Sequence, residues 1–466
     1  MHKAGAVVAV LLLAGGGAAW YSYAVSREHG VPLLGFDADT AYSDLEYLCN
    51  IGPRTPGSPE DETGALYVQS RFQEAGLLNV RIEEYRVTTF QVNSASLSLL
   101  NLQLRETVRK DYTHIRDFVL YQYSGSTGGT LRLEIVDVGN GTEEAFGGVD
   151  VTGKAVLSTQ QCLPRAAEKG ARAVIVQNTR LAAELGYPPY SGGLYGADAN
   201  GDSIPYPDAY PNAVVPTCAV SMAVGNEIRD AMNGSRRLPV VGSTVRMEFN
   251  FDTTIEKNPI YNVIGDVKGS KSPGDIIYIV AHRDSSYINP GAVDNAAGVA
   301  TIMEMARKMA RSLPAKTIRF ISTDAEETGL LGATEYCKAH EAEVQKHGIT
   351  CINFDMNDVN LRRVKVLNLQ CSNANHSREL ERIRGAFQGR YPDIAKKYTI
   401  NITGGGGGAD GGPFMKRGTD GSLAMGEWGS SWEYHTAGDT IQFVNRESWL
   451  VGGILLGSLA LSIADG

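Results

Sequence analysis

Three strongly apolar runs in the second half of the chain constrain its fold more than any other feature. They are "IIYIVAH" (276–282), "KTIRFIST" (316–323) and "TCINF" (350–354). Strands that are buried on both faces have such continuous apolar sequences, and helical patterns fill the stretches between these runs. The sequence therefore predicts an α/β fold with a mostly parallel, doubly wound sheet from about residue 252 onward.

Side chains that bind metals follow each of these predicted strands or start the next helix. They are His282, Asp294, Glu326, Glu327, Asp355 and, in a glycine-rich loop, His435. Ligands of doubly wound sheets bind beyond the carboxyl ends of the strands, so we expect these side chains at one edge. Taken singly, an Asp or His at such a position is usually structural. Together, these imidazole and carboxylate groups suit zinc, and a carboxylate can bridge two ions.

The adjacent carboxylates of Glu326 and Glu327 are expected to have different roles. Neighbouring side chains at the end of a strand point in different directions, so the two cannot readily bind one ion together. One of them suits a metal ligand and the other a general base acting on water. The residues alone leave open which glutamate has which role.

Changes in local composition and hydrophobic pattern divide the chain into four segments. A hydrophobic segment covers residues 1–26, and two parts of the main domain cover residues 33–112 and 252–464. Between these parts, residues 113–247 alternate short β-rich runs with a long loop rich in Gly, Tyr and Pro. This pattern of short β-rich runs and a long loop predicts an inserted, β-rich domain.

The first segment has the pattern of an export or anchoring sequence. Lys3 precedes an apolar run that carries no charge until Arg27. No A-x-A cleavage site follows, so an uncleaved signal anchor is favoured over a cleaved signal peptide. Either interpretation predicts an extracytoplasmic protein, anchored in a membrane or, if cleaved, secreted.

Charge and cysteine content exclude two classes of protein. The net charge is −9 and the isoelectric point is near 5.5, which argues against nucleic acid as a partner. The six cysteines are too few for a disulfide scaffold, and none is spaced as a thiol metal site.

Five motifs in order resemble the two-zinc metallo-exopeptidases, a family that includes leucyl aminopeptidases, aminopeptidase Y and glutamate carboxypeptidase II. They are "AHRDS", "PGAVDNAAG", "DAEETGLLGATEY", "INFDM" and "YHTAGDT". The predicted insert resembles a protease-associated domain in "VDVTGKAVLS" and "AAEKGARAVIVQN". The resemblance implies the zinc-dependent exopeptidase fold, two zinc ions and peptide substrates.

The resemblance also implies a ligand for each position around the two zinc ions. His282 and Asp355 would hold one zinc, Glu327 and His435 would hold the other, and Asp294 would bridge them.

Three further roles follow from the same resemblance. Glu326 would be the general base, and the Asp284 carboxylate would orient the imidazole of His282. The hydroxyl of Tyr434 would stabilise the oxyanion of the transition state.

Departures from the family pattern concern the substrate pocket. Asp410 follows a run of five glycines that predicts a flexible pocket wall, and Glu427 is a candidate for binding the substrate N-terminus. The segment before His435 contains no arginine to hold a substrate carboxylate, so an aminopeptidase is favoured. The alternatives are a glutamate carboxypeptidase-like enzyme and a non-catalytic receptor on the same scaffold. The motifs leave the preferred residue and the oligomeric state open.

Overall fold

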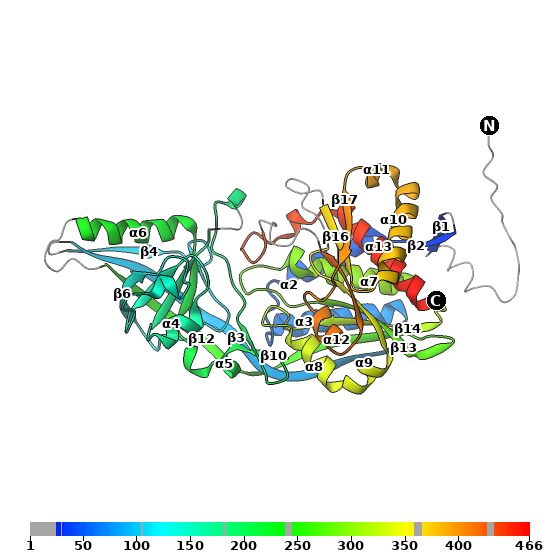
Figure 1. The fold of residues 1–466 in the computed structure, drawn as a ribbon, viewed down its shortest axis with the longest axis horizontal. Coiled ribbons are helices and arrows are strands. Elements are labelled where there is room, and N and C mark those ends of the chain that lie inside the picture. Colours follow the sequence, from blue (N-terminus) through cyan, green and yellow to red (C-terminus); the bar gives the residue numbers. More distant parts are fainter. Residues whose placement is uncertain are drawn as a thin grey trace, which may run out of the picture.

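The structure is a computed structural model that describes residues 25–28, 30–103, 106–179, 183–237, 245–357, 366–425 and 433–466. The chain forms a larger main lobe, with helices on both faces of a sheet, and a smaller second lobe beside it (Figure 1). The predicted anchor at residues 1–26 lies outside the described residues except for its last two positions, so it stays a prediction.

The main lobe is built on the predicted sheet. Its strands are β3 (Leu78–Gln103), β12 (Val245–Val267), β13 (Ser272–His282), β14 (Lys316–Thr323), β15 (Gly348–Phe354), β16 (Val366–Cys371), β17 (Thr399–Gly404) and β18 (Asp420–Met425). The spatial order is β17-β16-β18-β15-β13-β14-β12-β3, and the neighbours β18, β15, β13 and β14 run parallel. The pairs β16/β18, β12/β14 and β3/β12 flank this centre and are antiparallel. The prediction of a mostly parallel, doubly wound sheet is confirmed.

Helices cover both faces of this sheet. One layer contains α2 (Ala38–Ile51), α3 (Pro59–Ala75), α7 (Ala297–Met309), α10 (Ala374–Arg390) and α13 (Arg446–Asp465), and the other contains α8 (Leu331–Ala339), α9 (Glu341–His347) and α12 (Gly411–Lys416). Ile277 and Ile279 of β13 pack toward the first layer, whereas Tyr278 and Val280 pack toward the second. Since both faces are buried there, the strand is apolar at every position from residue 276 to residue 281.

Local sequence signals set the ends of α3. The Ser58 side chain accepts a hydrogen bond from the Asp61 N–H at 3.2 Å, and Pro59 takes the first helical position. Gly76 ends the helix with φ of 87°, a conformation that glycine adopts without strain. Both ends of the helix are therefore set by residues that favour a helix start or a helix end.

The second lobe has its own core. Its elements are β4 (Glu106–Tyr112), β5 (Phe118–Leu120), β6 (Leu131–Asp137), β7 (Ala155–Ser158), β8 (Ala173–Gln177), β9 (Tyr195–Ala197), β10 (Ser203–Pro205), β11 (Thr217–Val220), α4 (Leu163–Glu168), α5 (Tyr206–Ala209) and α6 (Met222–Arg237). Residues such as Leu120, Val156 and Ile175 form a cluster separate from the core of the main lobe.

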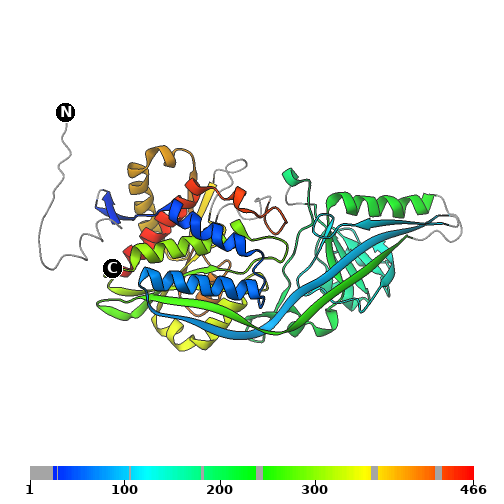
Figure 2. The same cartoon turned by 180° about the vertical axis from the view of Figure 1, so that it is seen from behind.

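Strands β3 and β12 run through both lobes as one long antiparallel ribbon (Figure 2). The β12 strand pairs with β6 of the second lobe at residues 246–249 and with β14 of the main lobe at residues 263–267. Phe90, Leu97 and Phe249 of the ribbon lie in the second core. The domain limits at residues 113 and 247 stay a prediction.

Shorter elements complete the described chain. They are β1 (Val25–Glu28), β2 (Val31–Leu34), η1 (Glu144–Phe146), η2 (Ala183–Leu185), η3 (Pro211–Ala213), η4 (Ala292–Ala296), α11 (Pro392–Ala395) and η5 (Ile441–Phe443). All six cysteines are free thiols.

The last helix, α13, is long and apolar enough to cross a membrane by length and composition. However, 78% of its most apolar window is buried within the protein. Trp449, Leu455 and Leu459 belong to the core of the main lobe, so the helix packs as a core element. An apolar helix of this kind is expected where an element is buried on most sides.

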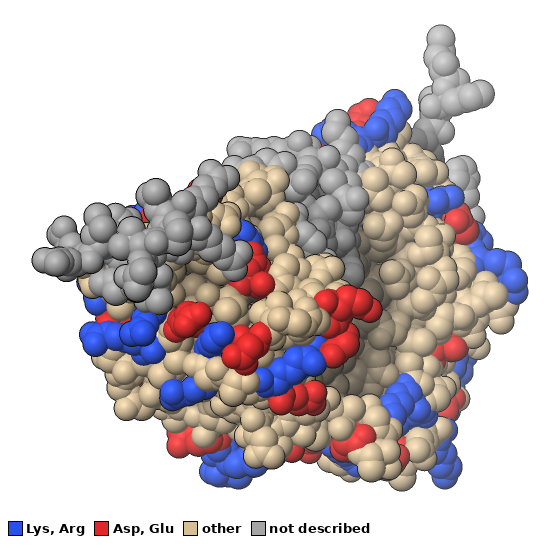
Figure 3. Space-filling model, turned by 60° about the vertical axis from the view of Figure 1, so that its left-hand side comes forward, with Lys and Arg blue, Asp and Glu red and all other residues tan. Residues whose placement is uncertain are grey.

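Charged residues of both signs are mixed over the surface drawn in Figure 3. Lys and Arg side chains lie among Asp and Glu side chains on that face (Figure 3). Its described residues therefore form no extended positive stripe, the feature by which proteins neutralise a phosphate backbone.

Candidate metal centre

The carboxyl ends of three neighbouring parallel strands bring the predicted ligands to one edge of the sheet. His282 is the last residue of β13, Glu326 and Glu327 follow β14, and Asp355 directly follows β15. Adjacent parallel strands end at the same edge, so sequence segments far apart meet there.

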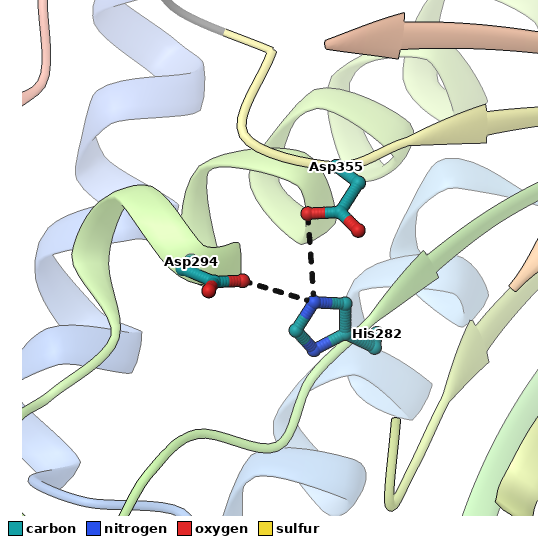
Figure 4. A group of neighbouring side chains, drawn as sticks. All are labelled: His282, Asp294 and Asp355. Carbon is teal, nitrogen blue, oxygen red and sulfur yellow. Dashed lines mark ion pairs between the residues drawn. The ribbon is translucent and has the colours of Figure 1, made fainter. Parts of the chain in front are cut away.

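His282, Asp294 and Asp355 form the first of two buried triads (Figure 4). The Nε2 atom of His282 lies 3.2 Å from Oδ1 of Asp294 and 3.7 Å from Oδ1 of Asp355. This nitrogen is buried and has no hydrogen-bond partner among the described residues. A buried imidazole nitrogen that faces two carboxylate oxygens fits a metal ligand.

Asp294, Glu327 and His435 form the second buried triad. The Nε2 atom of His435 lies 2.9 Å from Oε2 of Glu327 and 3.3 Å from Oδ2 of Asp294. Asp294 therefore turns one carboxylate oxygen toward each histidine. That is the arrangement of a carboxylate shared by two cations.

Asp294 lies in an irregular segment and not at the regular helix start that the sequence predicted. The α-helix begins at Ala297, and Asp294 has the non-helical angles φ −119° and ψ 88°. Asp439 accepts hydrogen bonds from the backbone N–H groups of Val293 at 2.7 Å and of Asp294 at 3.0 Å. A buried carboxylate thus helps to fix the backbone that carries the shared ligand.

The electrostatics of the two triads favour a bound cation. Burial raises the pKa of Glu327 and of Asp355. Burial opposes the charge on His282 and His435, yet the surrounding carboxylates raise the pKa of both imidazoles well above the ordinary value. Burial also opposes ionisation of Asp294, but both imidazoles lower its pKa. Divalent metals stabilise ionised carboxylates and neutral imidazoles in such a cluster.

Asp284 connects His282 to the paired glutamates. Its carboxylate accepts the backbone N–H of Glu326 at 3.0 Å and of Glu327 at 3.1 Å. Its carbonyl oxygen lies 3.2 Å from His282 Nδ1, and its carboxylate lies 3.5 Å from the same nitrogen. The residue therefore orients the imidazole through its backbone and side chain, and it also fixes the turn that separates the two glutamates.

A pocket of about 490 Å³ opens beside both triads. Glu326, which is only half-buried, and Tyr434 line it together with metal-triad carboxylates. Met356, Leu423 and Met425 form an apolar part of the lining. The pocket thus offers a carboxylate base, a hydroxyl and an apolar surface in one cavity.

Asp410, which the sequence predicted as a pocket residue, does not itself line this pocket. Asp410 is fully buried, and its carboxylate accepts a hydrogen bond from Thr323. Burial raises the pKa of Asp410 to about 7. Its neighbours Gly408 and Ala409 line the pocket in its place. Glu427 lies outside the described residues.

Within the glycine run before Asp410, Gly406 is buried and packs closely, whereas the other four glycines are exposed, and the flexibility of this wall stays a prediction. Gly406 has φ of 113°, and a Cβ atom added there would lie 2.4 Å from the carbonyl oxygen of Gly421. The Gly406 N–H donates a hydrogen bond to Oε1 of Gln370 at 3.1 Å. Close approach of two backbones therefore accounts for the glycine at this position.

Sequence reasoning missed three pocket residues, which come from the second lobe. Tyr190, Gly193 and Tyr195 line the pocket beside Glu326 and Tyr434. The only signal in the sequence was the loop rich in Gly, Tyr and Pro, which contains these residues but has no periodicity that would assign them to a site.

A buried ion network behind the centre was also missed. The Arg283 guanidinium donates to Oδ1 of Asp61 at 2.7 Å and lies 3.1 Å from Oδ2 of Asp324. All three side chains are fully buried. The network holds α3 against the segments on either side of the ligands.

Replacing Asp61 with alanine is expected to destabilise the fold, because it leaves the buried Arg283 charge with less compensation. Loss of one partner of a buried ion pair typically costs about 3–5 kcal/mol. Urea unfolding measures the change. Asp39→Ala is the control, since Asp39 pairs with Arg446 at the surface and its loss should cost less than ~0.5 kcal/mol. Equal stability of the two variants would contradict a stabilising role for the network.

Comparison with known proteins agrees with this geometry. Residues 262–453 match Peptidase family M28. The chain is 25% identical to Aminopeptidase YwaD of Bacillus subtilis (strain 168) over 93% of its own length and 87% of that protein. It is 26% identical to a Glutamate carboxypeptidase 2 homolog of Caenorhabditis briggsae over 65% of its length and 49% of that protein.

The fold is also similar to solved structures. BSAP, a zinc aminopeptidase from Bacillus subtilis, aligns with a TM-score of 0.70 and 22% identity over 92% of this chain and 96% of that chain. The alignment covers both lobes, so the two-lobed architecture described above is shared with that protein.

Proposed function

Because residues 262–453 match Peptidase family M28, we propose that this metallopeptidase is a zinc-dependent aminopeptidase. The observation that carries the proposal is a pair of buried triads that share Asp294 beside a pocket lined by Glu326. The relative that aligns over 93% of the chain is named an aminopeptidase.

The donor set fits two zinc ions. We propose that His282 and Asp355 hold one ion, that Glu327 and His435 hold the other, and that Asp294 is shared. When bound, the ions polarise the scissile carbonyl and lower the pKa of the attacking water.

Glu326 is the proposed general base. Its side chain lines the pocket, while Glu327 beside it turns toward His435. A carboxylate oxygen of Glu326 takes a proton from the attacking water and passes it to the nitrogen of the leaving amine. Tyr434 also lines the pocket. Its hydroxyl group donates a hydrogen bond to the oxyanion that forms on the former carbonyl oxygen.

The charge of the pocket disfavours a substrate held by its C-terminus. None of the described residues that line the pocket is Lys or Arg. A C-terminal carboxylate would need such a cationic partner, whereas a free N-terminus would not. The receptor alternative predicts lost ligands, and all five ligand positions hold competent residues.

The deciding experiment combines zinc analysis of the purified protein with a panel of amino-acid p-nitroanilides. We expect two zinc ions per chain and cleavage of substrates with a free amino group, with apolar residues preferred because of Met356, Leu423 and Met425. The matched N-acetylated substrates should resist cleavage. Cleavage only of acidic C-terminal residues from blocked peptides would establish the carboxypeptidase alternative. If the protein contained no zinc and cleaved no substrate, the non-catalytic receptor alternative would be favoured.

We further propose that residues 1–26 direct the catalytic part to the outside of the cytoplasmic membrane. The proposal is supported by Lys3 and the uncharged apolar run after it. Fractionation of cells, followed by N-terminal sequencing of the mature protein, tests both export and cleavage. A full-length protein found only in the cytoplasm would exclude the proposal.

A further inference from the structure

A short strip of the second lobe, Tyr190–Gly193, lies directly against the second metal triad. The Ser191 N–H donates a hydrogen bond to the carbonyl oxygen of His435 at 2.9 Å. The ring of Tyr190 stacks on the imidazole of His435, with centroids 5.3 Å apart and planes inclined by 23°. The strip therefore contacts both the backbone and the ring of this histidine.

The same strip also approaches Glu327. A Cβ atom added to Gly193 would lie 2.9 Å from the carbonyl oxygen of Glu327, closer than ordinary packing allows. The strip thus packs against two of the three members of the second triad. Within the described part of the chain, neither hydrogen bonds nor ring contacts link it to His282 or Asp355.

The two histidines are oriented by different means. The Nδ1 atom of His282 lies within hydrogen-bond distance of Asp284. The Nδ1 atom of His435 is buried, and no hydrogen-bond partner for it is found among the described residues. A metal-binding histidine usually has its second nitrogen fixed by such a partner. For His435, packing against two aromatic rings replaces that partner. The ring centroid of Tyr434 lies 3.8 Å from that of the imidazole, and the ring of Tyr190 also stacks on it.

The backbone of His435 needs the same support. Its φ of 52° lies in the left-handed region, which non-glycine residues rarely adopt. The hydrogen bond from Ser191 ends on the carbonyl group of this residue and so helps to hold that conformation.

We infer that the strip Tyr190–Gly193 positions His435 and Glu327, so that the second lobe controls the affinity of one of the two zinc positions and not of the other. The inference rests on the proposed function, because it takes the two triads to be zinc positions. The second lobe is then part of the metal centre as well as a wall of the pocket.

The test measures zinc per chain after dialysis of the full protein against a graded series of chelator concentrations. In the wild type, both zinc ions should be retained at low chelator concentration. Tyr190→Leu removes the stacked ring, and we expect the affinity of one zinc to fall about 10–100-fold, as for other residues that orient a ligand. The protein should then retain about one zinc per chain where the wild type retains two. Tyr190→Phe keeps the ring and should behave as the wild type.

A second variant and a control keep the test independent of folding defects. Gly193→Ala places a methyl group against Glu327 and should weaken the same zinc even if Tyr190→Leu does not fold, as judged by circular dichroism and melting. Tyr195→Leu is the matched control. Tyr195 lines the same pocket from the same lobe but is 60% exposed, so both zinc ions should be retained.

Combination with ligand variants identifies which zinc is affected. With His282→Ala, the remaining zinc should be lost when Tyr190→Leu is added. With His435→Ala, adding Tyr190→Leu should leave the remaining zinc unchanged. Equal weakening of both positions, or no change in folded Tyr190→Leu and Gly193→Ala proteins, would overturn the inference and leave the proposed function intact. A wild type that binds no zinc would instead overturn the proposed function.

Discussion

Replacing Glu326 with glutamine is expected to abolish nearly all peptidase activity while two zinc ions remain bound. The amide has almost the same shape as the carboxylate but cannot accept the proton of the attacking water. General acid–base groups contribute about 10²–10⁴-fold to the rate, so kcat should fall by that factor. Initial rates with leucine p-nitroanilide, together with zinc analysis of the same sample, measure both quantities.

Two other variants separate this role from a general effect of the mutation. Glu335→Gln changes a glutamate on α8 that pairs with Lys338 at 3.0 Å and does not line the pocket, so activity should be unchanged. Glu327→Gln should reduce zinc content, because Glu327 contacts His435. Full activity of Glu326→Gln would contradict the role of Glu326 as the base. Zinc loss in Glu326→Gln but not in Glu327→Gln would reverse the assignment of the two glutamates.

Replacing Asp294 with alanine is expected to remove both zinc ions. Its Oδ1 atom lies 3.2 Å from the first histidine and its Oδ2 atom 3.3 Å from the second, so both positions lose a donor at once. Changes outside the ligand shell cost 10–100-fold in metal affinity, so loss of a shared ligand should cost at least about 100-fold at each position. Equilibrium dialysis followed by elemental analysis gives the two affinities.

The matched variant is Asp355→Ala, which affects a carboxylate of the first triad alone. It should lose one zinc and retain the other. If Asp294→Ala and Asp355→Ala lost the same amount of zinc, Asp294 would not be a shared ligand.

The sheet and the ligand positions were predictable because burial imposes a simple pattern. Ile277 and Tyr278 point to opposite faces and are both covered by helices, so the whole run is apolar. A parallel strand of this kind ends at the edge where ligands bind, which places His282 and Asp355 there without further information.

Other features depend on contacts that no local pattern encodes. Tyr190 reaches His435 across 245 positions of sequence, and its loop has neither helical nor strand periodicity. Asp294 sits in irregular backbone whose conformation depends on Asp439, 145 residues further along. Asp410, just before α12, is buried where it accepts a hydrogen bond from Thr323 at the end of β14. Each of these results from tertiary packing that overrides or extends the local signals.

The ribbon formed by β3 and β12 restricts how lobes of this architecture can be exchanged between proteins. It carries the pairs Leu97↔Phe249 in the second lobe and Ile82↔Val263 in the main lobe on the same two strands. A shift of one residue would turn every following side chain to the opposite face. A chimaera that receives a foreign lobe therefore has to preserve the alignment of these two strands, because they carry residues of both cores.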